Sequence, residues 1–168
     1  WGGNPSSNRI NGKQTWEKYF GAKQVVNMGF GWDRIENVLW RVYHGEFDHF
    51  SPEQIVMMIG TNNLDLNSNS EIIEGLRFLT KAIHEKQPNS KILIMGILPR
   101  RKMEERVAAV NKLMATIPSV KKIKYTDAGK LFLSESGKIV ESLFLDGLHP
   151  NAAGYEKLAT FIVSQIEK

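Results

Sequence analysis

Hydrophobic and polar residues follow one another along the chain in blocks with two alternating periods. Short continuous hydrophobic runs predict buried strands over residues 23–29, 54–60, 91–97 and, more weakly, 123–129. Amphipathic spacing predicts helices over residues 12–20, 33–43, 70–87, 104–117 and 152–167. Strands that alternate with amphipathic helices through short loops indicate an α/β fold with a parallel sheet.

The helix expected over residues 33–43 shows the pattern most clearly. Ile35, Val38, Leu39 and Val42 share one face, and Asp33 stands where an N-cap is expected. It follows the first expected strand through a glycine-rich turn, so strand, turn and helix form one unit that recurs along the chain.

Composition narrows the class of protein. A chain of 168 residues with 42% hydrophobic and 24% charged residues predicts a single globular domain over residues 1–168. The net charge of +4 comes from basic residues scattered among acids, so we expect a mixed surface and no nucleic-acid partner. The absence of cysteine excludes disulfides and thiol nucleophiles. No hydrophobic run is long enough for a membrane span.

Ligands of parallel sheets bind outside the carboxyl ends of the strands, so the loops that follow the strands are the candidate sites. In NMGFGWDR, residues 27–34, two glycines allow a turn that presents backbone N–H groups to a ligand, although taken alone they are explained more simply by a tight structural turn. Arg34 occupies the place of the third glycine of a dinucleotide fingerprint. Asn62 and Asn63 follow Gly60 and offer amide donors, or only a turn.

The loop after the third expected strand is basic. Arg100, Arg101 and Lys102 lie at the same rim and could steer an anionic substrate group, but a solvated loop is the simpler interpretation. We assign these residues no catalytic role.

The segment LDGLHPNAAGY, residues 145–155, contains an acid three places before a histidine. Gly147 allows a tight turn and Pro150 favours an extended His149, so the side chains of Asp146 and His149 can converge. Such a pair serves as acid and base in triad chemistry, whereas the alternative is a polar turn before a helix. One His and one Asp make only half a metal-ligand set, so we expect no metal.

Together, NMGFGWDR followed by VLWR, then IGTNN, then DGLHPNAAGY resemble the blocks of the SGNH (GDSL-type) hydrolase superfamily, in order and spacing. The resemblance covers nearly the whole chain and is greatest to the branch of platelet-activating-factor acetylhydrolase catalytic subunits. It implies a flavodoxin-like three-layer sandwich with a parallel sheet, and an esterase that acts through an acyl-serine intermediate without metal or cofactor.

The resemblance also implies roles for individual residues. Asp146 and His149 match the acid and base of the triad, and Asn62 matches the amide donor to the oxyanion. The family's oxyanion glycine stands directly before an Asp, a place that Trp32 fills here, with Gly31 as the fallback if the turn is shifted. The implied substrates are small acyl esters of lipids or acetylated carbohydrates. Residues that could line an acyl pocket, or belong to the core, are Trp1, Phe30, Trp32 and Leu148.

One block of the family is absent. No Gly-Asp-Ser segment occurs, and Ser6 and Ser7 follow a loop rather than a strand. We therefore expect the sequence to begin just after the first, central strand and its nucleophile, and expect these residues alone to be inactive. The alternatives are a non-catalytic glycan- or acyl-binding module and, on fold alone, a nucleotide binder. Oligomeric state and location, whether exported, periplasmic or cytoplasmic, stay open.

Overall fold

The computed structural model describes residues 12–166, which divide into two compact units. Unit 1 contains residues 12–30, 98–104 and 128–166, and unit 2 contains residues 31–97 and 105–127. Each unit is described by itself, and the single domain expected from the sequence stays a prediction.

Unit 2 contains a parallel sheet of three strands in the order β1-β2-β3. The strands are β1 (Gln54–Met57), β2 (Lys91–Met95) and β3 (Ile123–Thr126). In the central strand every residue after Lys91 is buried, as the continuous hydrophobic run predicts for a strand covered on both faces. The α/β fold with a parallel sheet is therefore confirmed.

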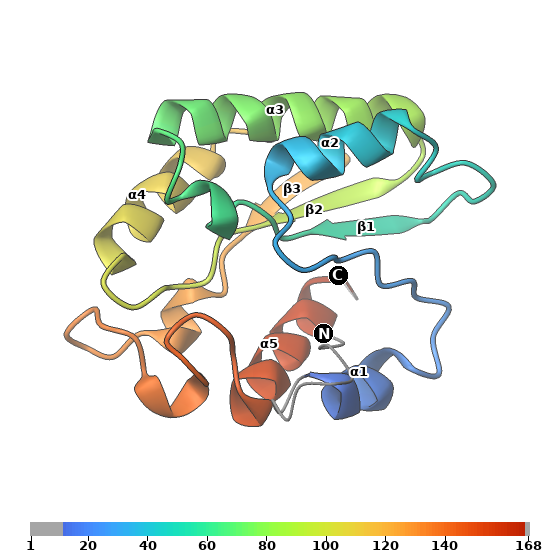
Figure 1. Cartoon of the computed structure of the whole chain (residues 1–168). Coiled ribbons are helices and arrows are strands. Elements are labelled where there is room, and N and C mark those ends of the chain that lie inside the picture. Colours follow the sequence, from blue (N-terminus) through green and yellow to red (C-terminus); the bar gives the residue numbers. More distant parts are fainter. Residues whose placement is uncertain (1–11, 167–168) are drawn as a thin grey trace. The chain divides into compact units, whose positions relative to one another are not determined.

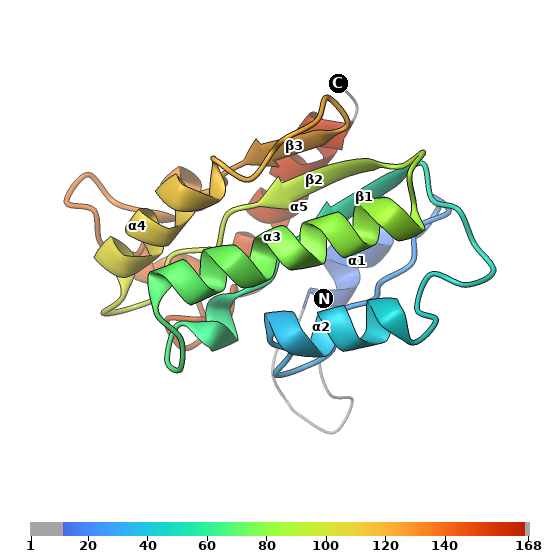
Figure 2. The same cartoon turned by 90° about the horizontal axis from the view of Figure 1, so that it is seen from above.

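The helices of unit 2 are α2 (Ile35–Tyr43), α3 (Asn69–Lys86) and α4 (Glu104–Met114), of which the first residue of α4 is counted with unit 1. Helices α2 and α3 pack side by side over one face of the sheet (Figure 1, Figure 2). Helix α3 begins where Ser68 and Glu71 form a reciprocal capping box. Its inward face is fully buried, so packing as well as capping fixes this helix.

Unit 1 contains the helices α1 (Lys13–Phe20) and α5 (Ala152–Ile166), which contact each other. The Tyr19 hydroxyl donates to a Glu156 carboxylate oxygen at 2.6 Å, and Lys18 forms an ion pair with the same carboxylate. Two 3-10 turns, η2 (Gly129–Phe132) and η3 (Glu141–Leu143), precede α5.

The strand expected over residues 23–29 is wrong. These residues have no regular secondary structure, and 70% of Val26 is exposed. A strand needs a neighbouring strand to bond its backbone, and among residues 12–166 no strand pairs with this segment. Residues 23–29 therefore have a composition typical of a strand, but composition does not show whether a neighbouring strand is present to pair with them.

Candidate active site

The loop that precedes α5 in unit 1 is closed at its base. Phe144 and Pro150 form an isolated antiparallel bridge, and the N–H of Leu145 donates to the His149 carbonyl at 2.8 Å. At the tip Gly147 has a φ of +83°, a left-handed conformation that glycine adopts without a Cβ penalty. The sequence therefore folds here into a tight turn with the acid and the histidine on its two sides.

Within this loop Asp146 and His149 contact each other as the sequence predicted. One carboxylate oxygen, Oδ1, accepts from the backbone N–H groups of Leu148 at 3.1 Å and His149 at 2.8 Å. The other, Oδ2, lies 2.8 Å from His149 Nδ1, which places the proton of a neutral imidazole on Nδ1. His149 Nε2 has no hydrogen-bond partner among the described residues, so it is available as an acceptor.

The loop holds the Asp146 carboxylate in its charged form. Partial burial by itself raises the pKa of this carboxyl. Hydrogen bonds from the His149 N–H, the His149 ring and the Leu148 N–H outweigh that effect and lower the pKa of Asp146 to about 2. The carboxylate is therefore charged at neutral pH and can orient the ring and balance an imidazolium.

The second candidate loop, in unit 2, turns at Trp32. This residue has a φ of +66°, in the left-handed region that non-glycine residues seldom occupy, and its side chain is 90% exposed. No described residue accepts a hydrogen bond from its backbone N–H. The place where the resembling family carries glycine therefore has a backbone conformation that suits glycine, although tryptophan occupies it.

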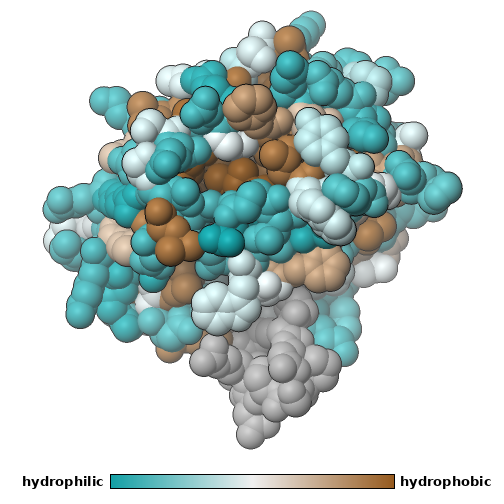
Figure 3. Space-filling view, turned by 45° about the horizontal axis from the view of Figure 1, so that its top comes forward, coloured by the Kyte–Doolittle hydropathy of each residue, from teal (hydrophilic) through white to brown (hydrophobic). Residues whose placement is uncertain are grey.

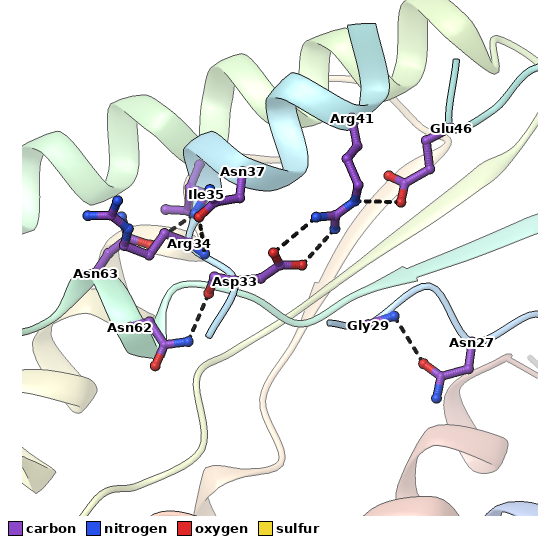
Figure 4. A network of polar contacts seen from close by, with 10 residues as sticks. All are labelled: Asn27, Gly29, Asp33, Arg34, Ile35, Asn37, Arg41, Glu46, Asn62 and Asn63. Carbon is purple, nitrogen blue, oxygen red and sulfur yellow. Dashed lines mark hydrogen bonds and ion pairs between the residues drawn. The ribbon is translucent and has the colours of Figure 1, made fainter. Parts of the chain in front are cut away.

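Asn62 reaches this turn from the neighbouring strand end. It lies in the 3-10 turn η1 (Thr61–Asn63), which follows Gly60 with a φ of +116°. Its Nδ2 donates to the Asp33 carbonyl at 2.9 Å, so the two loops of unit 2 are joined beside Trp32 (Figure 4). The same amide nitrogen carries a second N–H for which the described part of the chain supplies no acceptor.

Asn63, the next residue, has a different task. It is buried, and its Oδ1 accepts the Ile35 N–H at 3.0 Å, which satisfies a free donor at the start of α2. Its Nδ2 donates to Glu36 and Asn67. The two adjacent asparagines therefore have different roles. Asn63 binds the start of α2, and Asn62 binds the turn that contains Trp32 and Asp33.

The expectation that Asp33 caps α2 is wrong. Its carboxylate forms a bidentate pair with the Arg41 guanidinium at 3.0 and 2.6 Å, and Arg41 also donates to Glu46 at 2.8 Å (Figure 4). The hydrogen bond to Asp33 is the main cause that raises the pKa of Arg41. The exposed fractions of the Arg41, Asp33 and Glu46 side chains are 20%, 13% and 11%, so this charged cluster is largely buried.

The predicted site residues are thus found as two pairs. Asp146 and His149 lie together in unit 1, and Trp32 and Asn62 lie together in unit 2. Of the expected pocket residues, Phe30 is exposed and Leu148 is half-buried, whereas Trp1 lies outside the described residues.

Sequence reasoning missed the partners of Arg101. Its Nε and Nη2 donate to the two carboxylate oxygens of Glu141, and its Nη1 donates to the Asp146 carbonyl. A solvated loop was expected at this position; about half of the Arg101 side chain is exposed, and its guanidinium is in addition held by these partners. The only sequence signal was the place of the basic loop after a strand end.

Other surface features of the described residues do not compete with these two pairs. Residues 12–166 contain no cluster of three or more His, Asp or Glu side chains suited to a metal ion. Helices α2 and α3 border a shallow groove where hydrophobic side chains gather between hydrophilic ones (Figure 3); Ile35, Leu39, Gly75 and Phe78 line its apolar part. A membrane-spanning helix is also absent from the described residues, because none of their helices is both long enough and apolar enough to cross a bilayer.

A comparison with protein families matches residues 2–157 to the GDSL-like lipase/acylhydrolase family. The chain belongs to this family. All four predicted site residues of the pairs above lie within the matched range, and the resemblance inferred from the sequence blocks is confirmed.

Among curated members similar to this GDSL-like chain is the platelet-activating factor acetylhydrolase IB subunit alpha2 of Homo sapiens. It is 31% identical over 150 residues, which are 86% of this chain and 65% of that protein. The chain thus spans somewhat less than two thirds of the length of this relative.

Solved structures confirm the fold of the GDSL-like chain. A GDSL-like lipase from Bacteroides thetaiotaomicron aligns with a TM-score of 0.79 at 16% identity, over 92% of this chain and 80% of its own. A carbohydrate esterase of family 3 from Talaromyces cellulolyticus aligns with a TM-score of 0.69 at 20% identity, over 83% and 69% of the two chains. At these identities the similarity concerns the fold.

Proposed function

We propose that the protein containing this chain is a serine ester hydrolase for acetyl or short-chain acyl esters. The contact between Asp146 and His149 carries the proposal. The Asp146 carboxylate binds His149 Nδ1, and His149 Nε2 forms no hydrogen bond with any described residue. A general base for a serine hydroxyl requires this arrangement. Membership of the GDSL-like lipase/acylhydrolase family supports the same chemistry.

In the first half of the reaction, His149 Nε2 takes the proton of the serine hydroxyl while Oγ attacks the ester carbonyl carbon. The oxyanion that forms accepts hydrogen bonds from the Trp32 N–H, from the Asn62 amide and from the N–H of the nucleophile itself. When the tetrahedral intermediate collapses, the bond to the alcohol oxygen breaks. His149 returns its proton to that oxygen, and the acyl group stays on serine.

In the second half, a water molecule replaces the alcohol. His149 takes a proton from water as its oxygen attacks the acyl carbon, and the same oxyanion donors hold the second intermediate. The serine leaves with the proton from His149, and the free acid is released. Asp146 keeps its charge throughout and stabilises the imidazolium in each half.

The hydrogen bond between Asn62 and Asp33 supports the oxyanion role of unit 2. It brings the Asn62 amide next to the turn that carries the Trp32 N–H, and both donors have a free N–H within the described residues. That these donors and the pair in unit 1 act on one ester is part of the proposal.

We place the nucleophile on a segment that precedes residue 1. No Gly-Asp-Ser segment occurs among the 168 residues. Among the described residues β1 pairs with a strand on one side only, and the strand that carries such a segment is proposed to pair with its outer edge. Sequencing the gene upstream of Trp1 tests this directly: a strand followed by Gly-Asp-Ser or Gly-Asn-Ser is expected, and Ala or Gly in place of the serine would indicate a binding module.

The relatives suggest the substrate class. One is called a platelet-activating factor acetylhydrolase and a structural neighbour a carbohydrate esterase, so acetylated lipids and acetylated sugars are the first esters to compare. An acyl pocket that includes Phe30 and Leu148 would favour short chains. Trp1 is proposed for the same pocket from the sequence.

Replacing the general base tests the activity. In the full-length protein, His149→Ala should reduce kcat for p-nitrophenyl acetate by at least about 10³-fold, because the hydroxyl loses its base. His49→Asn is the matched control, since it removes an exposed imidazole at a φ of +74° that asparagine tolerates. Equal activity of His149→Ala and the natural protein would refute the proposed mechanism.

A further inference from the structure

Arg101 contacts the backbone of the loop that carries the acid-base pair. Its own N–H donates to the Gly147 carbonyl at 2.8 Å, and its Nη1 donates to the Asp146 carbonyl at 3.1 Å. Two successive carbonyl groups at the tip of the loop are therefore bound by one residue. All of these contacts lie within unit 1.

Gly147 makes this close approach possible. A Cβ built on Gly147 would lie 2.7 Å from both Cζ and Nε of Arg101, closer than real carbon contacts permit. The guanidinium therefore lies against bare backbone, where any other residue would displace it. Two features therefore favour glycine at position 147: its φ of +83° and the close approach of Arg101.

Glu141 fixes the other side of the guanidinium. Its two carboxylate oxygens accept from Nε at 2.9 Å and from Nη2 at 2.6 Å, so the pair is bidentate and the plane of the guanidinium is set. About half of each side chain is exposed, and exposed ion pairs add little to folding stability. The pair is therefore better suited to orienting Arg101 than to stabilising the fold.

The bound carbonyls control where the neighbouring N–H groups point. The peptide group that carries the bound Gly147 carbonyl also carries the Leu148 N–H, and the next peptide group carries the His149 N–H; both N–H groups donate to Asp146 Oδ1. Rotation of the Gly147–Leu148 peptide would turn the Leu148 N–H away from Oδ1, shift the His149 N–H that follows it, and move Oδ2 away from His149 Nδ1. A contact with the backbone of the loop thus sets the geometry of its side chains.

We propose that Arg101 is a positioning residue for the acid-base pair, which fixes the loop backbone so that the Asp146 carboxylate meets His149. This inference rests on the ester hydrolysis proposed above. It assigns a role to the basic loop that differs from steering an anionic substrate, because the guanidinium is already engaged by Glu141 and by the loop.

Kinetics of Arg101→Gln in the full-length protein test the inference. A displacement of the pair by about 1 Å should lower kcat for p-nitrophenyl acetate by about 10- to 100-fold with little change in KM. Lys102→Gln is the matched control, because it removes one positive charge from the next residue, whose ammonium makes no contact with the loop among the described residues. The control should retain the kcat of the natural protein.

Arg101→Lys separates position from charge. Lysine keeps the positive charge but cannot bind Glu141 through two N–H groups while a third reaches the Asp146 carbonyl. We expect its kcat to stay closer to that of Arg101→Gln than to that of the natural protein. Full activity of Arg101→Lys would overturn positioning in favour of a simple charge effect.

The inference can be tested separately from the proposed function by titrating Asp146, because this measurement does not depend on catalysis. Carbon-13 NMR of the Asp146 carboxyl should show its pKa rising from about 2 toward the ordinary value in Arg101→Gln and Arg101→Lys, but not in Lys102→Gln. An unchanged pKa in folded Arg101→Gln would overturn the inference. A shifted pKa in a protein without esterase activity would refute the proposed function and leave the positioning intact.

Glu141→Gln provides a second route if the arginine variants fail to fold. It loses the bidentate ion pair but leaves Arg101 in place, so a loss of kcat in the same direction and of about 3- to 10-fold is expected. Unchanged kcat and an unchanged Asp146 titration in this variant would also overturn the inference.

Discussion

The two candidate loops are held in opposite ways. The turn at Trp32 in unit 2 is followed directly by Asp33, which belongs to the largely buried charged cluster with Arg41 and Glu46, and Asn62 donates to the Asp33 carbonyl. The loop with Asp146 in unit 1 is exposed and is held by hydrogen bonds to its own backbone and by Arg101, whose partner Glu141 is also exposed.

Because of this difference, substitutions in the two loops should affect different properties of the protein. Removing one partner from a buried charged cluster leaves an uncompensated charge, so the turn in unit 2 should be sensitive through folding. Removing an exposed partner costs little stability, so the loop in unit 1 should be sensitive through the geometry of its side chains.

The largest effect on stability is expected for Arg41→Met. Asp33 and Glu46 would lose the guanidinium while largely buried, which should lower the free energy of unfolding by about 2 to 3 kcal/mol, somewhat less than for fully buried pairs. Denaturant unfolding of the full-length protein measures the loss. Lys81→Met, which breaks an exposed pair with Glu85 on α3, should change stability by less than about 0.5 kcal/mol. Equal losses in the two variants would remove the contrast.

A smaller effect of opposite sign is expected for Trp32→Gly. Glycine relieves the left-handed conformation, and the exposed indole loses little packing, so stability should rise by about 0.5 to 1 kcal/mol. Lys102→Gly is the matched variant in unit 1, because Lys102 has the same φ of +66°. Thermal unfolding should show a similar gain for both. A loss in Trp32→Gly alone would mean that the indole packs against a part of the protein beyond the described residues.

The smallest effect concerns pH and the loop of unit 1. The pKa of Asp146 is lowered from 3.8 to about 2, so its stabilisation is present above pH 4 and is lost as the pH falls toward 2. Because 41% of the side chain is exposed, screening reduces the contribution to about 0.5 kcal/mol. The difference in unfolding free energy between the natural protein and Asp146→Asn should therefore be present at pH 5 and be largely lost at pH 2. A difference that grows toward low pH would contradict the sign.

Local patterns predicted the fold well where local physics decides it. The start of α3 falls at Asn69, one residue from the prediction, because Ser68 and Glu71 cap it within a single turn. Residues 23–29 failed because a strand depends on a neighbour, and the hydrophobicity of Val25 and Val26 does not reveal whether one is present.

The same distinction applies to the candidate site. The contact between Asp146 and His149 followed from residues three apart around a glycine, so the sequence predicted it. Arg101 and Glu141, which form an ion pair, are 40 residues apart in the sequence. Asp33 forms an ion pair with Arg41 instead of capping α2, although its place before the helix favoured a cap. Neither pair has a local signal, since folding alone brings the partners together.

The outer edge of β1 has a practical consequence for handling this polypeptide. Within the described residues, Gln54–Met57 bonds to β2 on one side only, and this short stretch contains neither a charge nor a proline. Such an edge is a template onto which another molecule can add a strand, and Val56 is partly exposed there. Concentrated solutions of these residues alone would thus be prone to fibrous self-association, with seeding and lag phases rather than simple precipitation.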